Sequence, residues 1–198
     1  MTLVVGITGG IGSGKSTFSK EVIKRNLKLL DSDKEVGLIY KNPKENFLNH
    51  LRKIGLEKSI KNKVINKKYI QSIIFTDRNI KTKLETYIFK IVRKNRSIFV
   101  KKEKKRKTNI IFLDIPLLFE NNLDKEFDVV VTIISSKKER LKRLQKSKKI
   151  SKQTFNKIIK SQTTDKERKT RSDIIIYNNY SIGKYLKKVN IILDKIIP

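Results

Sequence analysis

The sequence predicts a three-layer α/β fold built on a five-stranded parallel sheet. Three observations support this class. Apolar, β-branched runs alternate with segments of helical periodicity, a glycine-rich loop follows the first run, and 198 residues suit one domain with a small insertion. Strands and helices that alternate in this way pair in parallel through right-handed crossovers, so ligands are expected at the carboxyl ends of the strands.

The expected strands are short runs with apolar residues, and those at 109–113 and 127–134 are β-branched and suited to burial on both faces of a parallel sheet. They lie at residues 3–8, 28–30, 109–113, 127–134 and 173–177. The first run has no positively charged leader, so we expect a buried strand and not a signal peptide. No apolar run approaches the roughly 20 residues that span a bilayer, which favours a cytoplasmic protein without a membrane partner.

The expected helices connect these strands. One begins near Ser16, and lysine-rich candidates at 35–40, 44–53 and 67–75 form a helical insertion. Thr76-Asp77 supplies an N-cap for a long helix that the basic run 101–107 closes. A capping box at Ser136 to Glu139 opens a helix that ends near Ser147, and further helices follow Ser151 and Ser181.

We therefore expect one domain over residues 1–198. Its core comprises residues 1–34 and 107–198, and its insertion comprises residues 35–106. Aromatic residues of the insertion are interpreted as its core in preference to a stacking platform; they are Phe47, Phe75, Tyr87 and Phe89.

Residues 9–16 read Gly-Gly-Ile-Gly-Ser-Gly-Lys-Ser and fit the motif G-x-x-x-x-G-K-[ST] in full, after a strand and before a helix. Glycines let the backbone N–H groups turn around a phosphate, and the helix adds the positive end of its dipole. Lys15 is expected to reach the β- and γ-phosphates of ATP, and the Ser16 hydroxyl to bind Mg²⁺. The motif predicts a P-loop NTPase fold with these ATP-binding residues: Gly12, Ser13, Gly14, Lys15, Ser16 and Thr17.

Two carboxylates follow expected strands at the ligand-binding edge of the sheet. Asp33 is placed to accept the proton of an attacking hydroxyl. Asp114 is placed to hold Mg²⁺ directly or through water. On position alone, each is equally compatible with a turn or a helix cap.

Composition excludes several classes of site and protein. There is no cysteine and only one histidine, so any metal must be bound by oxygen, and His50 is expected at the surface or half-buried without a catalytic role. The guanine-reading Asn-Lys-x-Asp of GTP-binding switch proteins is absent. The net charge of +29 accompanies 30 Ile, 15 Asn and no Ala, the pattern of AT-rich codon usage, so we expect no specific nucleic-acid partner. A positive field should still attract anionic substrates.

These residues together resemble the dephospho-CoA kinase family. The matching segments follow in order over nearly the whole chain: residues 6–17, Leu30 to Asp33, the block Asp114-Ile-Pro-Leu-Leu-Phe-Glu120, Phe127-Asp128, Gln162, and 172–178. The resemblance implies ATP-dependent phosphorylation of the ribose 3′-hydroxyl of dephospho-CoA, with Asp33 as general base. It also implies that the insertion binds dephospho-CoA, that residues 140–162 form a lid over ATP, and that Asn178 is an ATP-binding residue. We expect a monomer, although the sequence does not determine the oligomeric state.

The chain departs from the family at two places. Phe89-Lys90 replaces a His-Pro pair in the long helix. In the lid, the family has Gln-x-x-Arg followed by an Arg-Asp pair. Here Arg140 replaces the glutamine, and Arg143 keeps the first arginine, which we expect to be a catalytic ATP contact. Ser147-Lys148 replaces the Arg-Asp pair. Lysines lack the planar fork of arginine, so substitution of the lost arginine by Lys146, Lys148 or Lys149 predicts a reduced rate.

Three alternatives stay open at this point. Arg168 either reaches phosphate across a closed lid or lies on a solvated helix. The protein either phosphorylates dephospho-CoA or phosphorylates another small hydroxyl acceptor. A third possibility, from a different class, is a nucleic-acid-binding ATPase with salt-sensitive binding.

Overall fold

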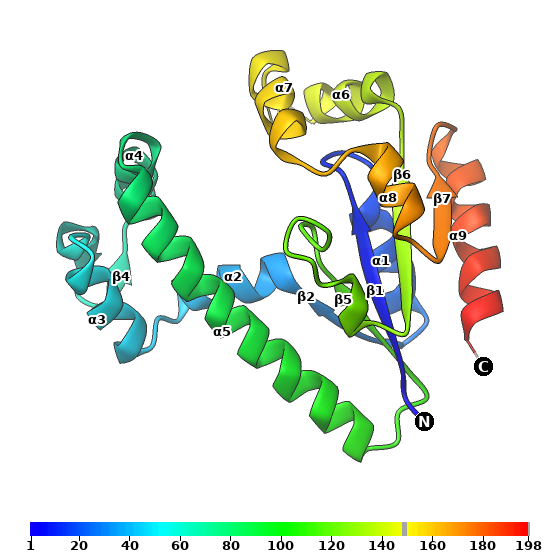
Figure 1. Cartoon of the computed structure of the whole chain (residues 1–198), viewed down its shortest axis with the longest axis horizontal. Coiled ribbons are helices and arrows are strands. Elements are labelled where there is room, and N and C mark those ends of the chain that lie inside the picture. Colours follow the sequence, from blue (N-terminus) through cyan, green and yellow to red (C-terminus); the bar gives the residue numbers. More distant parts are fainter. Residues whose placement is uncertain (148–149, 198) are drawn as a thin grey trace. The chain divides into compact units, whose positions relative to one another are not determined.

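A computed structural model describes residues 1–147 and 150–197. In this part of the chain, five strands form one parallel sheet in the order β2-β5-β1-β6-β7 (Figure 1). The strands are β1 (Leu3–Gly9), β2 (Lys28–Asp31), β5 (Ile110–Asp114), β6 (Val129–Ile134) and β7 (Ile174–Tyr177). The central strands are buried almost throughout because helices and loops cover both faces, so the predicted three-layer α/β fold is confirmed.

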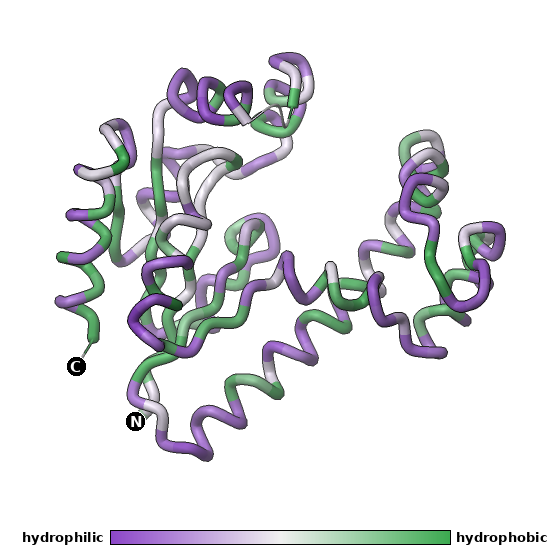
Figure 2. Tube along the Cα trace, turned by 180° about the vertical axis from the view of Figure 1, so that it is seen from behind, coloured by the Kyte–Doolittle hydropathy of each residue, from purple (hydrophilic) through white to green (hydrophobic). Residues whose placement is uncertain are grey.

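Helices α1 (Lys15–Lys24) and α9 (Ile182–Ile196) cover one face of the sheet. Phe18 and Val22 of α1 pack with Tyr185, Val189 and Leu193 of α9 against apolar side chains of all the central strands. In Figure 2, hydrophobic residues run along the strands and alternate with hydrophilic ones along α9. The helical spacing of the buried residues of α9 explains this alternation.

The opposite face of the sheet is covered by the chain after β5 and by α8 (Asp165–Thr170), which contacts β6. Leu118 and Phe127 lie so close to Gly6 that a Cβ at that position would meet both side chains at about 3 Å. Leu118, Phe119 and Leu123 are buried here. The sequence did not predict α8, a helix of only six residues.

Two further helices follow β6: α6 (Lys137–Lys146) and α7 (Lys152–Ser161). Only half of the predicted capping box forms. The Ser136 hydroxyl accepts a bond from the Glu139 N–H (3.3 Å), whereas the N–H of Ser136 donates to Asn179 Oδ1 (2.8 Å). Asn179 therefore takes the place that the prediction gave to the Glu139 side chain.

The described residues divide into two compact units, one made of Met1–Asp31 with the chain from Val100 onward, the other of Ser32–Phe99. The second unit contains α2 (Ser32–Lys41), α3 (Glu45–Lys53), a 3₁₀ turn (Glu57–Ser59), the hairpin β3 (Ile60–Lys61) and β4 (Val64–Ile65), α4 (Lys67–Thr76) and most of α5 (Arg78–Lys105). Asp77 caps α5 through a bond from the Ile80 N–H (2.9 Å).

The core of the second unit corrects part of the aromatic prediction. Phe47 is buried and stacks with Tyr87, which in turn stacks on His50 (ring centroids 3.8 Å apart). Phe75 and Phe89 are exposed, so the interpretation of these two as core was wrong. The hairpin was also missed, because its turn places Asn62 and Lys63 at positive φ, where lysine is rare and gives little sequence signal.

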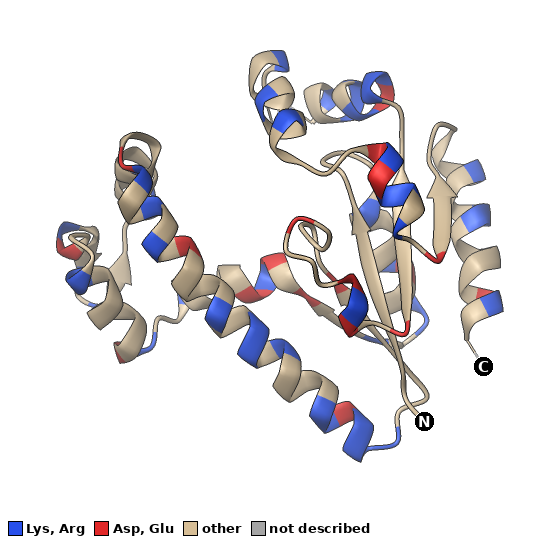
Figure 3. Ribbon diagram, viewed as in Figure 1, with Lys and Arg blue, Asp and Glu red and all other residues tan. Residues whose placement is uncertain are grey.

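No helix in residues 1–147 and 150–197 is long and apolar enough to cross a membrane. Lys and Arg are spread over α5, α6, α7 and α9 (Figure 3). Basic residues also fill the last turn of α5, where they meet the negative end of the helix dipole.

Candidate active site

The glycine-rich loop joins the carboxyl end of β1 to α1. Gly12 (φ 73°) and Gly14 (φ 106°) adopt backbone conformations that other residues rarely take, and Gly14 serves as the N-cap of α1. Gly14 has a second constraint, since a Cβ there would lie 2.2 Å from Asn178 Nδ2. The loop therefore reaches the helix by a path that only glycine can follow.

The carbonyl oxygens of the loop accept hydrogen bonds from buried and half-buried side chains. Asn178 Nδ2 donates to the Ser13 carbonyl (2.7 Å), and the Tyr185 hydroxyl donates to the Gly14 carbonyl (3.1 Å). Arg143 of α6 donates to the carbonyls of Gly12 (3.4 Å) and Asn178 (2.7 Å). Burial raises the pKa of Tyr185, so its hydroxyl stays protonated and remains a donor. These contacts pre-organise the loop.

The segment between α7 and α8 also contacts the loop. Gln162 Oε1, at the end of α7, accepts a bond from the Ile11 N–H (3.1 Å). The Thr163 N–H donates to Glu120 Oε1 (2.8 Å), which ties this segment to the chain that follows β5. Gln162 stood out in the sequence, but its bond to the loop had no signal there.

Lys15 lies beside the predicted metal ligand Asp114. Its ammonium group forms an ion pair with Asp114 Oδ1, and the Ser19 hydroxyl donates to Asp114 Oδ2 (2.6 Å). Asp114 ends β5 next to β1 and is only 2% exposed, so both oxygens of this buried carboxylate have partners. Sequence reasoning missed Ser19, which stands one turn of α1 after Lys15.

The donor set near Lys15 suits Mg²⁺. Among the described residues, no three His, Asp or Glu side chains come together as a metal cluster. An ion here would depend on the Asp114 carboxylate, the hydroxyl of the exposed Ser16 and the phosphates of ATP. Such a small set of hard oxygens, completed by water and substrate phosphate, is what Mg²⁺ prefers, so the residues fit this ion.

The two acidic residues of the Asp-Ser-Asp segment fall in different units. Asp31 ends β2 and is the register partner of Asp114 on β5. Asp33 lies in the first turn of α2, where the positive end of the helix dipole favours the ionised carboxylate. Along the chain, Asp33 follows the last residue of β2 by two positions.

A cluster of buried charges adjoins the loop at Gly10. Arg140 of α6 and Arg168 of α8 are 3% and 2% exposed, so the solvated-helix interpretation of Arg168 was wrong. Both pair with Asp165 Oδ1, at 3.7 Å and 3.1 Å, and Arg168 also pairs with Glu120 (3.2 Å). Burial, and then the charge of Arg168, lower the pKa of Arg140 against the opposing effect of Asp165.

The structure gives little support to the lysines that were predicted to substitute for the lost lid arginine. Lys146 ends α6 and is exposed, while Lys148 and Lys149 lie outside the described residues. Thr17 continues α1, and its N–H bonds to the Gly14 carbonyl (3.0 Å). Phe89 and Lys90 both belong to α5 and are exposed.

A phosphate loop between a central strand and a helix, with its lysine held at a buried aspartate on the adjacent strand, defines a P-loop kinase fold. A family profile for dephospho-CoA kinase matches residues 3–184. The chain belongs to the dephospho-CoA kinase family.

Curated relatives of this family match over nearly the full chain. The dephospho-CoA kinase of Fusobacterium nucleatum is 35% identical over 191 residues, which cover 94% of this chain and 95% of that protein. The dephospho-CoA kinase of Oceanobacillus iheyensis is 32% identical over 197 residues, 98% of each chain. The solved dephospho-CoA kinase from Campylobacter jejuni has a TM-score of 0.76 at 24% identity, covering 100% of this chain and 98% of that one, and so supports the fold.

Proposed function

We propose that this protein transfers the γ-phosphoryl group of ATP to the ribose 3′-hydroxyl of dephospho-CoA, giving coenzyme A and ADP. The observation that carries the proposal is the pre-organised phosphate loop with Lys15 at Asp114, in a chain of the dephospho-CoA kinase family. This reaction is the last step of coenzyme A synthesis.

The loop supplies the binding part of the mechanism. Its backbone N–H groups and the N-terminus of α1 bind the phosphates, and Lys15 carries positive charge to the β- and γ-phosphates. Asp114 and Ser19 position the Lys15 ammonium before ATP arrives. Mg²⁺, held by Ser16 and Asp114, would supply further positive charge against the phosphates.

Asp33 supplies the proton acceptor. The 3′-oxygen of the acceptor attacks the γ-phosphorus as the bond from that phosphorus to the β–γ bridging oxygen breaks, and ADP leaves with that oxygen. The hydroxyl proton passes to the carboxylate of Asp33, in the first turn of α2. Catalysis of phosphoryl transfer comes mostly from positioning and from charge stabilisation. Loss of the proton acceptor Asp33 alone therefore lowers turnover without abolishing ATP binding.

Arg143 takes a positioning role in this mechanism. Its guanidinium bonds to the carbonyls of Gly12, Ser13 and Asn178 and to the Ser135 hydroxyl. We therefore propose that Arg143 and Asn178 hold the loop in its phosphate-binding form and support ATP binding through the loop backbone.

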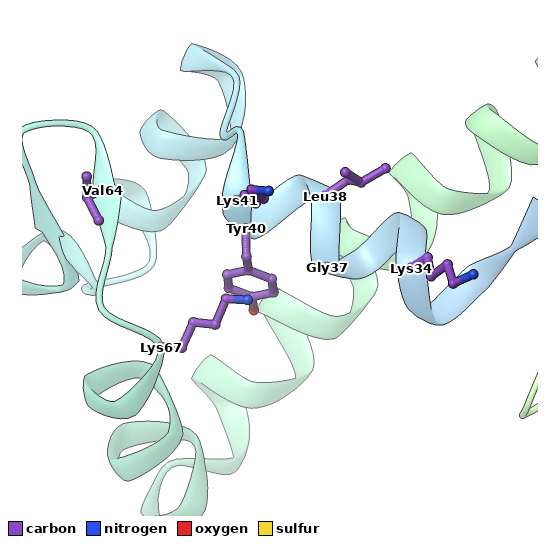
Figure 4. Close-up of a pocket in the computed structure, with 7 residues that line it drawn as sticks. All are labelled: Lys34, Gly37, Leu38, Tyr40, Lys41, Val64 and Lys67. Carbon is purple, nitrogen blue, oxygen red and sulfur yellow. The ribbon is translucent and has the colours of Figure 1, made fainter.

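The second unit contains a pocket suited to the body of an anionic acceptor. It has a volume of about 690 Å³ and lies along α2, the helix that begins with Ser32 and Asp33 (Figure 4). Lysines and apolar groups alternate around it; the lining side chains include Lys34, Leu38, Tyr40, Lys41, Val64 and Lys67. Lys67 lies over the Tyr40 ring (5.2 Å), and burial raises the pKa of Tyr40 to about 12, so this phenol stays neutral. Such a lining suits a molecule with both phosphates and an aliphatic arm.

We further propose that the enzyme works as a cytoplasmic monomer without a specific nucleic-acid partner. Basic residues spread over several helices instead of one motif support the absence of a specific nucleic-acid site. Salt-sensitive binding of DNA or RNA together with nucleic-acid-stimulated ATP turnover would overturn this part.

An acceptor panel tests the proposed substrate. The purified protein is incubated with ATP, Mg²⁺ and equal concentrations of dephospho-CoA, a nucleoside, shikimate or gluconate, and the phosphorylated product is identified by mass spectrometry and ³¹P NMR. We expect a 3′-phosphate on dephospho-CoA, formed at a rate at least about tenfold above that of the other acceptors. A wrong acceptor leaves polar groups of the binding site without partners, which strongly disfavours its reaction. A faster reaction with another hydroxyl acceptor would replace the substrate but keep the kinase class.

A further inference from the structure

Gly10 of the phosphate loop is glycine for reasons of space. It occupies a variable position of the motif, and its backbone, unlike that of Gly12 and Gly14, is not among those with positive φ in the described chain. A Cβ on Gly10 would lie 2.0 Å from Arg140 Nη1 and 3.3 Å from Arg168 Nη1. The guanidinium of Arg140 therefore rests directly on the loop backbone, in space that alanine would fill.

The two arginines are incompletely satisfied where they lie. Both use a single oxygen of Asp165, and the contact of Arg140 is the longer at 3.7 Å. Within residues 1–147 and 150–197, Arg140 Nε and Arg168 Nε are buried without a hydrogen-bond partner, and so is Glu120 Oε2. A buried guanidinium with an unused donor is costly unless an anion completes its bonds.

We propose that Arg140 is a phosphate-contacting residue that binds the terminal phosphate of ATP, and that the absence of a side chain at Gly10 leaves the space that its guanidinium occupies. This inference rests on the proposed function only in taking ATP as the nucleotide. Planar guanidinium groups match phosphate oxygens in pairs, and two of them beside the loop suit the extra charge of a triphosphate over a diphosphate. Asp165 and Glu120 hold the two arginines in place and keep the resting cluster neutral.

The test measures discrimination between triphosphate and diphosphate without an acceptor. Calorimetry with Mg²⁺ gives the dissociation constants of ADP and of the β,γ-imido analogue of ATP for the wild type and Arg140→Gln. We expect Arg140→Gln to raise the dissociation constant of the imido analogue about 10- to 100-fold, the size of one lost charge-assisted contact. The dissociation constant of ADP should rise by no more than about twofold. Glutamine is shorter than arginine, keeps a hydrogen-bonding end and removes the charge.

Gly10→Ala supplies an independent second variant, because it displaces Arg140 without altering any charge. We expect it to lower the affinity for the imido analogue in the same selective way. The double variant should bind the analogue no more weakly than the weaker-binding single variant, since both changes remove the same contact. Gly183→Ala in α9 is the matched control, because nothing lies within 4 Å of a Cβ there.

Each outcome decides the inference. Equal weakening of both nucleotides by Arg140→Gln, with a lower melting temperature, would show a clamp that only holds α6 on the loop and would overturn the phosphate contact. Unchanged affinities would overturn it as well. If Arg140→Gln shows the expected selective loss but dephospho-CoA does not stimulate turnover of the wild type, the proposed substrate fails and the role of Arg140 stands.

Discussion

Replacing Asn178 with alanine should destabilise the protein before any nucleotide binds. The side chain is 5% exposed; its Nδ2 donates to the Ser13 carbonyl (2.7 Å) and its Oδ1 accepts from Arg143 Nη2 (3.2 Å). Truncation leaves the Ser13 carbonyl with only the long bond from Arg143 (3.5 Å) and removes one acceptor from that guanidinium. Leaving one buried polar group unpaired costs about 1–3 kcal/mol.

The assay is thermal unfolding followed by circular dichroism, first without nucleotide and then with ATP and Mg²⁺. For a chain of this size, about 2–4 °C of melting temperature are lost per kcal/mol, so about 1–3 kcal/mol corresponds to a drop of roughly 2–12 °C. Asn179→Ala is the matched neighbour, because its bond to the Ser136 N–H is exposed and we expect a change within about 0.5 kcal/mol. An Asn178→Ala protein that melts like the wild type without nucleotide, yet binds ATP poorly, would refute the loop-anchor role and make Asn178 a direct ATP contact.

Three further predictions follow from the site and the second unit. Asp114→Asn should lower turnover at least about tenfold and raise the Mg²⁺ concentration needed for half-maximal rate, because it removes the carboxylate that positions Lys15; an unchanged Mg²⁺ titration would argue against a metal role. Lys41→Ala and Lys67→Ala should each raise KM for dephospho-CoA severalfold and leave KM for ATP unchanged, with the exposed Lys195→Ala as control; a rise for ATP instead would place the pocket outside the acceptor site. Burial chiefly lowers the pKa of His50, so as pH falls the unfolded chain takes up this proton before the folded protein does. The contribution of His50 to the free energy of unfolding is therefore complete above the ordinary pKa of 6.5 and declines below it. Urea unfolding at pH 5 and 7.5 should show a smaller loss of stability at pH 5 for His50→Gln than for the wild type, and an equal loss in both proteins would contradict this.

The sheet and the loop were predictable because their signals are local. β-branched runs buried on both faces give continuous apolar segments, and the phosphate loop needs glycine at fixed places such as Gly12 and Gly14. The N-cap at Asp77 was predicted for the same reason, since the capping side chain and the N–H that it accepts from lie three residues apart.

The parts that were missed depend on contacts between distant residues. Ser19 and Asp114 lie 95 positions apart in sequence, and the bond between Gln162 and Ile11 spans 151 positions. The sequence left a solvated Arg168 open because a charged residue is usually exposed, and its pairing with the distant Glu120 and with Asp165 explains its burial. The roles of Asp33 and of the pocket along α2 stay predictions, as does the assignment of Mg²⁺.

The central claim is tested most directly by ADP formation with ATP and Mg²⁺, with and without dephospho-CoA, for the wild type and Asp33→Asn. The account predicts turnover that depends on dephospho-CoA and falls at least about 100-fold in Asp33→Asn, with ATP affinity within about twofold of the wild type. A wild-type protein that binds ATP but shows no stimulation by dephospho-CoA would contradict the proposed function. An Asp33→Asn enzyme with undiminished turnover would contradict the assignment of the base.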